Sequence, residues 1–130
     1  QEHPDFSVVP LFTWRVPHAV GEMLTSQERK YGIHAGDAET SIMLSLLPQQ
    51  VQMDKAVKEY PQGLPKDSLL DMEGQLPFAW LTKELTKSGV MGDATVATTE
   101  KGDRILESLA TGWVQVIQDV YKFQQPNFDY

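Results

Sequence analysis

The stretch "GIHAGDAETSIMLSLLP", from Gly32 to Pro48, decides how the middle of this chain folds. Its apolar residues recur at helical spacing until Pro48 stops the run, so we expect a helix from about Ala38 to Leu47. Asp37 precedes this helix as a good N-cap, and Glu39 suits the positive charge of the first helical turn. The same stretch holds a histidine, a glycine and two carboxylates. It therefore predicts either an ordinary capped helix or part of an active site.

The composition is that of a folded chain with one domain. Its 130 residues match the commonest domain size, and 41% hydrophobic with 22% charged residues is an ordinary globular mixture. A formal charge of -7 without a dense Lys/Arg cluster argues against nucleic-acid binding. Neither a run of ~20 apolar residues nor a signal segment is found, so we expect a cytoplasmic protein without a membrane partner. The absence of Cys excludes disulfides and zinc-thiolate sites.

Segments of different character flank the central helix. Residues 6–12 form a nearly continuous apolar run, which predicts a buried, parallel strand with an edge, bulge or end at Pro10. Residues 15–32 predict a loop or a short helix. The Pro- and Gly-rich segment 49–78 predicts an irregular excursion with a short strand near 69–72.

The last part of the sequence predicts a long amphipathic helix from about Glu100 to Phe123. Thr98 or Thr99 would cap this helix, and Pro126 would end it. The prediction depends on apolar residues that step by three and four, namely Ile105, Leu106, Leu109, Trp113, Val116, Ile117, Val120 and Tyr121.

His34 is the first candidate for chemistry. A neutral imidazole can bind a metal or move protons, and the carboxylates of Asp37 and Glu39 can act as ligands or as a general base. Gly36 would let the backbone approach a ligand closely. Spacing alone favours the alternative, a partly buried loop histidine beside a capped helix, because no HExxH motif is present. With only three histidines in the chain, a catalytic metal also needs Asp, Glu or ligands from elsewhere.

Two further features allow a functional or a structural interpretation. The segment 88–102, "SGVMGDATVATTEKG", predicts a tight turn whose N–H groups bind an anion, or simply a turn and a helix cap. The large rings of Trp14, Tyr31 and Trp80 can wall a substrate pocket, although aromatic residues more often pack in a core or an interface. For both features the sequence by itself favours the structural interpretation.

Two motifs in order change this balance, because together they resemble the creatininase family of metal-dependent amidohydrolases. The first motif is H-A-G-E-x-E-T-S-x-M-L with a later Pro and Val, and the chain follows it from His34 to Val51 with Asp37 in place of the usual Glu. The second motif is S-G-x-x-G-D-x-x-x-A-T-x-x-K-G after a strand that contains Trp. The chain follows it from Ser88 to Gly102.

The resemblance implies a fold, a metal site and partners. The fold would be α/β, a three-layer α/β/α arrangement with a mostly parallel sheet, and residues 1–130 would be the carboxyl-terminal part of a single domain. A metal centre of one or two Zn, Mn or Fe ions would lie at the carboxyl ends of the strands. The family's E-x-H-G-x-H-L-P and N-G-H-G-G-N segments are not found in this sequence. The expected partner is therefore an amino-terminal half, cleaved or separate, within a homo-oligomer such as a hexamer.

The activity that the resemblance implies is hydrolysis of a C–N bond in a cyclic amide or formamide. His34 would be catalytic, donating a proton to the leaving nitrogen or stabilising the tetrahedral intermediate. Glu39 or Asp37 would be a metal ligand, and Tyr31 and Gly36 would lie near the substrate. This chain alone would be inactive. The alternative is a non-catalytic structural or regulatory subunit that has kept the fold without the metal motifs.

Overall fold

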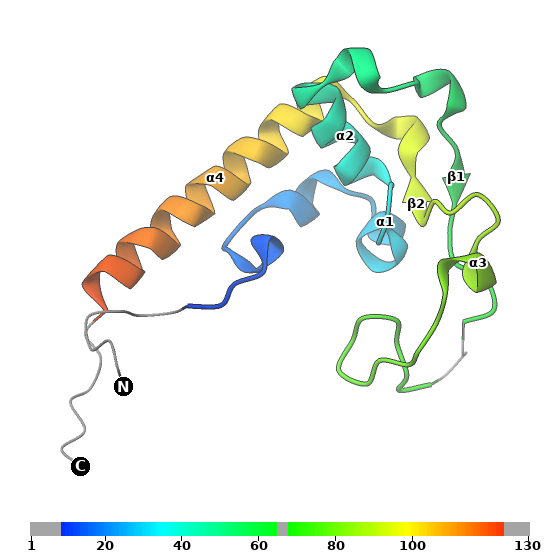
Figure 1. Cartoon of the computed structure of the whole chain (residues 1–130), viewed down its shortest axis with the longest axis horizontal. Helices are drawn as coiled ribbons and strands as arrows, with labels where there is room; N and C mark the ends of the chain where they lie inside the picture. The colour runs from blue at the N-terminus through cyan, green and yellow to red at the C-terminus, as the bar shows by residue number, and fades with distance from the viewer. Residues whose placement is uncertain (1–8, 65–67, 124–130) are drawn as a thin grey trace, which may run out of the picture.

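A computed structural model describes residues 9–64 and 68–123 of the chain. Its longest element is helix α4, Thr99–Lys122, which extends as an arm from the rest of the molecule (Figure 1). The Thr98 hydroxyl accepts a hydrogen bond from the Lys101 N–H at 3.2 Å and so caps the first turn. The predicted long helix and its Thr98 cap are confirmed, whereas Pro126 lies outside the described residues.

Helix α2, Asp37–Leu46, confirms the predicted central helix. The prediction that Asp37 is the N-cap is wrong, because Gly36 holds that position and Asp37 is the first helical residue. Its carboxylate bonds a distant lysine instead of the N–H groups of its own first turn. The first turn of α2 is therefore tied to another part of the chain.

The contact between α2 and α4 depends on Gly102. A Cβ atom on this residue would lie 2.0 Å from the carbonyl oxygen of Ser41 and 2.9 Å from Cβ of Ser45. Only a residue without a side chain allows the two helix backbones to come this close. The first core cluster fills the space beside this contact, with Val16, Val20, Ile105 and Leu109 buried and Met23, Leu24, Ala38, Ile42, Trp113 and Val116 packed around them.

The rest of α4 carries a second apolar stripe, which we call the outer face of α4. It consists of Leu106, Ala110, Val114, Ile117 and Tyr121, at the spacing of one side of a helix. The exposed fractions reach 61% at Ile117 and 91% at Tyr121. Figure 1 shows that one side of α4 lies along the amino-terminal segment while the opposite side faces away from the chain.

The sheet of the described region is small. Strand β1, Lys58–Glu59, pairs antiparallel with β2, Gly92–Asp93, and His34 and Met91 form an antiparallel bridge beside them. The α/β class is confirmed, but the strand pairing seen in the described ranges is antiparallel and not the expected mostly parallel sheet.

The strand predicted for residues 6–12 is not formed over residues 9–12. Val9, Leu11 and Phe12 are exposed there, and residues 6–8 lie outside the described part of the chain. An extended apolar run becomes a strand only when a neighbouring strand takes its backbone hydrogen bonds, and the described residues supply none here. The short strand expected near 69–72 is reduced to one parallel bridge between Asp71 and Pro77.

The loop or short helix predicted for residues 15–32 is confirmed by η2 (Val20–Met23) and α1 (Ser26–Tyr31). The other short helical segments are η1 (Thr13–Arg15), η3 (Pro48–Gln50), η4 (Met53–Lys55), α3 (Thr82–Leu85) and η5 (Ala94–Val96). A second core cluster of Met72, Leu85 and Met91 lies on the side of β1, β2 and α3. Among the helices of residues 9–64 and 68–123, none combines the length and apolar character that a membrane crossing requires.

Candidate functional site

The loop between α1 and α2 presents His34. Its backbone is fixed by Met91, whose carbonyl accepts from the Ile33 N–H at 2.8 Å and whose N–H donates to the His34 carbonyl at 2.8 Å. Ala35 follows with φ of 52°, a left-handed conformation that is costly for a residue with a side chain. The loop therefore turns sharply, immediately after a histidine held by backbone pairing.

Glu39 lies next to His34, in the first turn of α2. Its Oε2 accepts from the Ala35 N–H at 2.6 Å and lies 3.7 Å from Nδ1 of His34. The two side chains are 65% and 47% exposed, so both groups can meet a ligand. An exposed imidazole beside a carboxylate has what proton transfer or metal coordination requires.

A cavity of about 790 Å³ opens beside this pair, with His34, Glu39, Glu28 and Trp14 in its wall. A second recess, of about 640 Å³, shares Trp14 and Glu39 with this cavity and is lined largely by apolar groups, including Met43. Large apolar hollows with a few convergent polar groups are typical of small-molecule sites. Trp14, for which the sequence favours packing in a core or interface, is 42% exposed and lies in the wall of both hollows.

Asp37 is separated from the exposed pair by an ion pair with Lys101. The ammonium group lies 2.7 and 2.6 Å from the two carboxylate oxygens and also donates to the Val96 carbonyl at 3.2 Å. The Asp37 side chain is only 3% exposed, and Ser41 donates a further hydrogen bond to it. Since a cation already occupies this buried carboxylate, the geometry opposes the expected metal ligation by Asp37 and leaves Glu39 as the accessible carboxylate.

Glu28 is buried beneath the His34 loop, although no pattern in the sequence singles it out. Its Oε1 accepts from the Asp37 N–H at 2.7 Å, and its Oε2 accepts from the Asp93 N–H at 3.0 Å and from the Tyr60 hydroxyl at 2.9 Å. A glutamate in the polar helix "SQERKY" looks like a solvated residue. Its partners are distant in sequence or lie in a loop, so no local spacing could reveal them.

The pKa values of two groups around Glu28 are shifted, that of Tyr60 upward and that of Asp93 downward. Burial, together with hydrogen bonding to Glu28, raises the pKa of Tyr60 to about 12, so its phenol stays a donor at neutral pH. Burial alone would raise the pKa of Asp93. The hydrogen bond from Thr95 and the ammonium of Lys58 outweigh this effect and hold the pKa below its usual value.

Gly36 and Tyr31, the predicted substrate contacts, both lie close to other residues of the chain. A Cβ atom on Gly36 would lie 2.2 Å from Oε1 of Glu28 and 3.1 Å from Cα of Gly92, so the close approach here is internal. Tyr31 packs against the second core cluster with its ring edge toward Tyr60. Gly36 also lies in the wall of the 790 Å³ cavity, so its predicted role beside a substrate stays a prediction, as does that of Tyr31.

The turn predicted to bind an anion holds a carboxylate of the chain itself. The Lys87 and Ser88 N–H groups donate to Glu59 at 2.8 Å each. Hydrogen bonds from the Lys87 N–H and then from Ser88 lower the pKa of this carboxyl. The structural interpretation of segment 88–102 is therefore supported, with Thr98 as the helix cap at its end.

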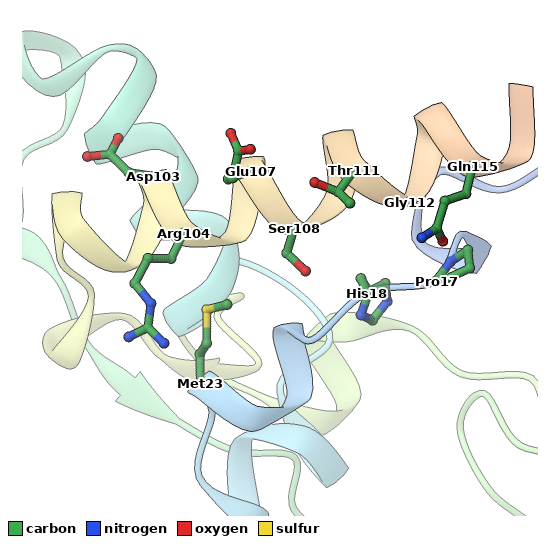
Figure 2. Close-up of a pocket in the computed structure, with 10 residues that line it drawn as sticks. All are labelled: Pro17, His18, Met23, Asp103, Arg104, Glu107, Ser108, Thr111, Gly112 and Gln115. Carbon is green, nitrogen blue, oxygen red and sulfur yellow. The ribbon is translucent and has the colours of Figure 1, made fainter. Parts of the chain in front are cut away.

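A cavity of about 660 Å³ lies between α4 and the segment around η2, away from His34 (Figure 2). Figure 2 shows Arg104 and Ser108 pointing from α4 toward Met23 and His18, whereas Asp103 and Glu107 point to the opposite side of the helix. His18 is engaged locally, with its ring nitrogens 3.2 Å from the Trp14 carbonyl oxygen and 3.3 Å from the Val20 nitrogen. This histidine stabilises the segment before η2.

The described residues do not complete a metal site by themselves. Within residues 9–64 and 68–123, no group of three or more His, Cys, Asp or Glu side chains is placed to hold an ion. His34 and Glu39 offer two donors, whereas catalytic zinc sites usually take three protein ligands. At least one further ligand would have to come from other residues.

Known proteins are similar to this chain in both sequence and fold. A family model described as creatininase, creatinine amidohydrolase, matches residues 1–117. The chain is 30% identical over 99 residues to a 3-dehydro-scyllo-inosose hydrolase of Thermotoga maritima, covering 68% of this chain and 32% of that protein. It is 28% identical over 121 residues to a creatinine amidohydrolase of Pseudomonas putida, covering 90% of this chain and 44% of that protein. The chain therefore spans less than half the length of these relatives.

Solved structures give the same result. A mutant creatininase described as Zn-Zn type is 30% identical with a TM-score of 0.61, covering 88% of this chain and 43% of that one. A structure described as creatininase Mn is 27% identical with a TM-score of 0.61, over the same shares of both chains. The fold described above is thus found within larger proteins. One of these structures is described as a Zn-Zn type and the other as an Mn form.

Proposed function

Because this chain belongs to the creatininase family, we propose that it is the carboxyl-terminal part of a hydrolase that cleaves a C–N bond of a cyclic amide or formamide. The observation that carries this proposal is the exposed pair of His34 and Glu39 at the wall of the 790 Å³ cavity. Its relatives include a creatinine amidohydrolase, which agrees with an amide substrate. The apolar recess of 640 Å³, which Glu39 also lines, suits the carbon skeleton of a small ring.

His34 acts as the proton donor in this proposal. Amide cleavage requires a proton on the departing nitrogen, and an imidazole is suited to deliver it near neutral pH. The Glu39 carboxylate, 3.7 Å from Nδ1, stabilises the protonated ring and biases its orientation. The proton can then leave from Nε2 toward a substrate in the cavity.

A divalent metal, zinc or manganese, completes the proposed site. Structures described as Zn-Zn type and Mn forms of creatininase support the choice of metal. When bound, such a metal supplies Lewis acidity and lowers the pKa of a water ligand. Since His34 and Glu39 are too few to hold it, most of its ligands would come from an amino-terminal part of the same fold.

The outer face of α4 is where that amino-terminal part would dock. Exposed apolar stripes of this kind mark interaction surfaces in soluble proteins. The stripe from Leu106 to Tyr121 is unpaired within the described residues, and the chain covers only 43% of each solved structure cited above. We also predict that the complete protein forms a homo-oligomer, such as a hexamer.

The alternative is a non-catalytic subunit with a creatininase-like fold. The incomplete ligand set of the described residues favours this alternative. Metal content and hydrolysis of creatinine by the complete protein separate the two ideas. A metal-free complete protein without hydrolase activity on cyclic amides or formamides would refute the proposed activity.

The role of His34 is tested by His34→Ala in the complete, metal-loaded protein. General acid–base catalysis contributes about 10²–10⁴-fold, so kcat should fall by that order while the bound metal is retained. Glu39→Gln should also lower kcat, whereas Glu84→Gln is a matched control that should not. Glu84 makes the same kind of contact, accepting from the Leu81 N–H at 3.0 Å. Unchanged turnover in the His34 variant would refute its role.

A further inference from the structure

We propose that Glu28 is a positioning residue that fixes the His34 loop for turnover. The proposal deepens the proposed function, because its effect on kcat presupposes a hydrolase at His34. Its structural part depends only on the contacts of one buried carboxylate. Glu28 is 3% exposed although it lies in a helix whose other residues are polar or charged up to Tyr31.

Glu28 joins two chain segments that are more than fifty residues apart. Its Oε1 accepts from the Asp37 N–H, at the end of the His34 loop. Its Oε2 accepts from the Asp93 N–H, in strand β2, and from the Tyr60 hydroxyl. Both oxygens are therefore used, and each bonds a backbone N–H of a different segment.

Three glycines make this arrangement possible. A Cβ atom on Gly36 or Gly92 would lie 2.2 or 2.7 Å from Oε1 of Glu28, and one on Gly32 would lie 2.6 Å from the same oxygen. A Cβ atom on Gly92 would also lie 2.6 Å from Cα of Gly36. The backbones of the two segments thus meet directly over the carboxylate, which leaves little freedom for the loop to shift.

The loop is held at both of its ends. Backbone pairing with Met91 fixes Ile33 and His34 at the start, and Glu28 fixes Asp37 at the finish. Between these anchors the chain passes through the left-handed Ala35, which would relax if either anchor were lost. Met91 holds the start of the loop directly, and Asp93 bonds Glu28, which holds its end. Because Met91 and Asp93 belong to the same segment, both ends of the loop are positioned by residues 91–93.

A carboxylate is required here, and an amide cannot replace it. The two backbone N–H groups need an acceptor on each oxygen of Glu28. A glutamine has one acceptor oxygen and one NH₂ donor, so in Glu28→Gln one N–H group would face another donor. A buried donor without an acceptor is costly, and the loop or strand β2 must move to find one.

The kinetic test compares Glu28→Gln with a core variant in the complete protein, with creatinine as the substrate. A displacement of about 1 Å can cost 10²-fold in rate, so we expect kcat to fall by that order with KM changed less than about threefold. Leu109→Ala, a cavity variant in the first core cluster, controls for lost stability. Tyr60→Phe, which keeps both backbone bonds, should have the smaller effect of the two Glu28-site variants. A kcat in Glu28→Gln no lower than in Leu109→Ala, at a temperature where both are folded, would overturn the proposal.

Hydrogen exchange provides a readout that does not need activity. In the wild type the amides of Asp37 and Asp93 should exchange slowly, and in Glu28→Gln at least one of them should exchange more than tenfold faster while the Ile105 amide is unchanged. Equal protection in both proteins would overturn the positioning role. If the wild type hydrolyses neither creatinine nor a formamide, the proposed function fails, but the exchange result still decides whether Glu28 holds the loop.

Discussion

Replacing Gly102 by Ala should destabilise the protein, against the usual benefit of alanine in a helix. Alanine is favoured over glycine by about 1 kcal/mol within a helix. At this position its Cβ atom would lie 2.0 Å from the Ser41 carbonyl oxygen, so α2 and α4 must separate by about 1.4 Å to reach an ordinary contact. Overpacking of this kind costs about 1–3 kcal/mol, and a rigid backbone neighbour places it at the upper end. We expect a net loss of about 2 kcal/mol in the free energy of unfolding.

Urea and thermal unfolding of the complete protein measure this loss, which corresponds to a fall of about 4–8 °C in Tm. Gly21→Ala is the control, because its Cβ atom would lie 3.4 Å from Cδ of Arg29, an ordinary contact. The control should stay within about 0.5 kcal/mol of the wild type. If Gly102→Ala were as stable as the control, the close approach of α2 and α4 could not be the reason for a glycine here.

The remaining predictions concern the ion pair, the buried phenol and the outer face of α4. Lys101→Met should lower the free energy of unfolding by about 3 kcal/mol, because it leaves the Asp37 carboxylate buried without a cation. In a double-mutant cycle, adding Asp37→Asn should restore most of the lost stability, and additive losses would contradict the coupling. Tyr60 should titrate near pH 12 in an ultraviolet titration. Since its pKa is raised on folding, its contribution to stability should be present below pH 10 and lost as the pH rises toward 12. A Tyr60→Phe variant that loses stability over the same alkaline range as the wild type would refute this contribution. Ile117→Glu should prevent co-purification with an amino-terminal half of the fold, whereas Thr111→Glu, on the polar side of α4, should not. If both variants recovered the same amount of that half, docking at the outer face of α4 would be refuted.

The helices could be predicted from the sequence because their signals are local. The apolar positions of α4 and its Thr98 cap lie within a few residues of each other, and so do the residues that form α2. The strand at residues 6–12 could not, since a strand depends on a neighbour that local sequence does not specify. Its exposed Phe12 shows that an apolar run is not by itself a buried strand.

The candidate site divides in the same way. His34 and Glu39 are five residues apart, so their proximity follows from one loop and one helical turn. The separation of Asp37 from this pair depends on Lys101, which is 64 residues away in the sequence. Glu28 was missed for the same reason, because its partner Asp93 is 65 residues away. The two motifs that resemble the creatininase family identified the exposed chemistry, whereas the buried polar contacts depend on the assembled fold.

The crowding around Glu28 also bears on how this site can change during evolution. Gly32, Gly36 and Gly92 each exclude a Cβ atom because of the same glutamate, and two of them exclude each other. A single substitution at any of these positions meets a clash before it can offer a benefit. Removing Glu28 would make room but leave two backbone N–H groups without their acceptor. New loop shapes at His34 are therefore reachable only through several simultaneous substitutions, and selection for a new substrate should act first on the cavity walls.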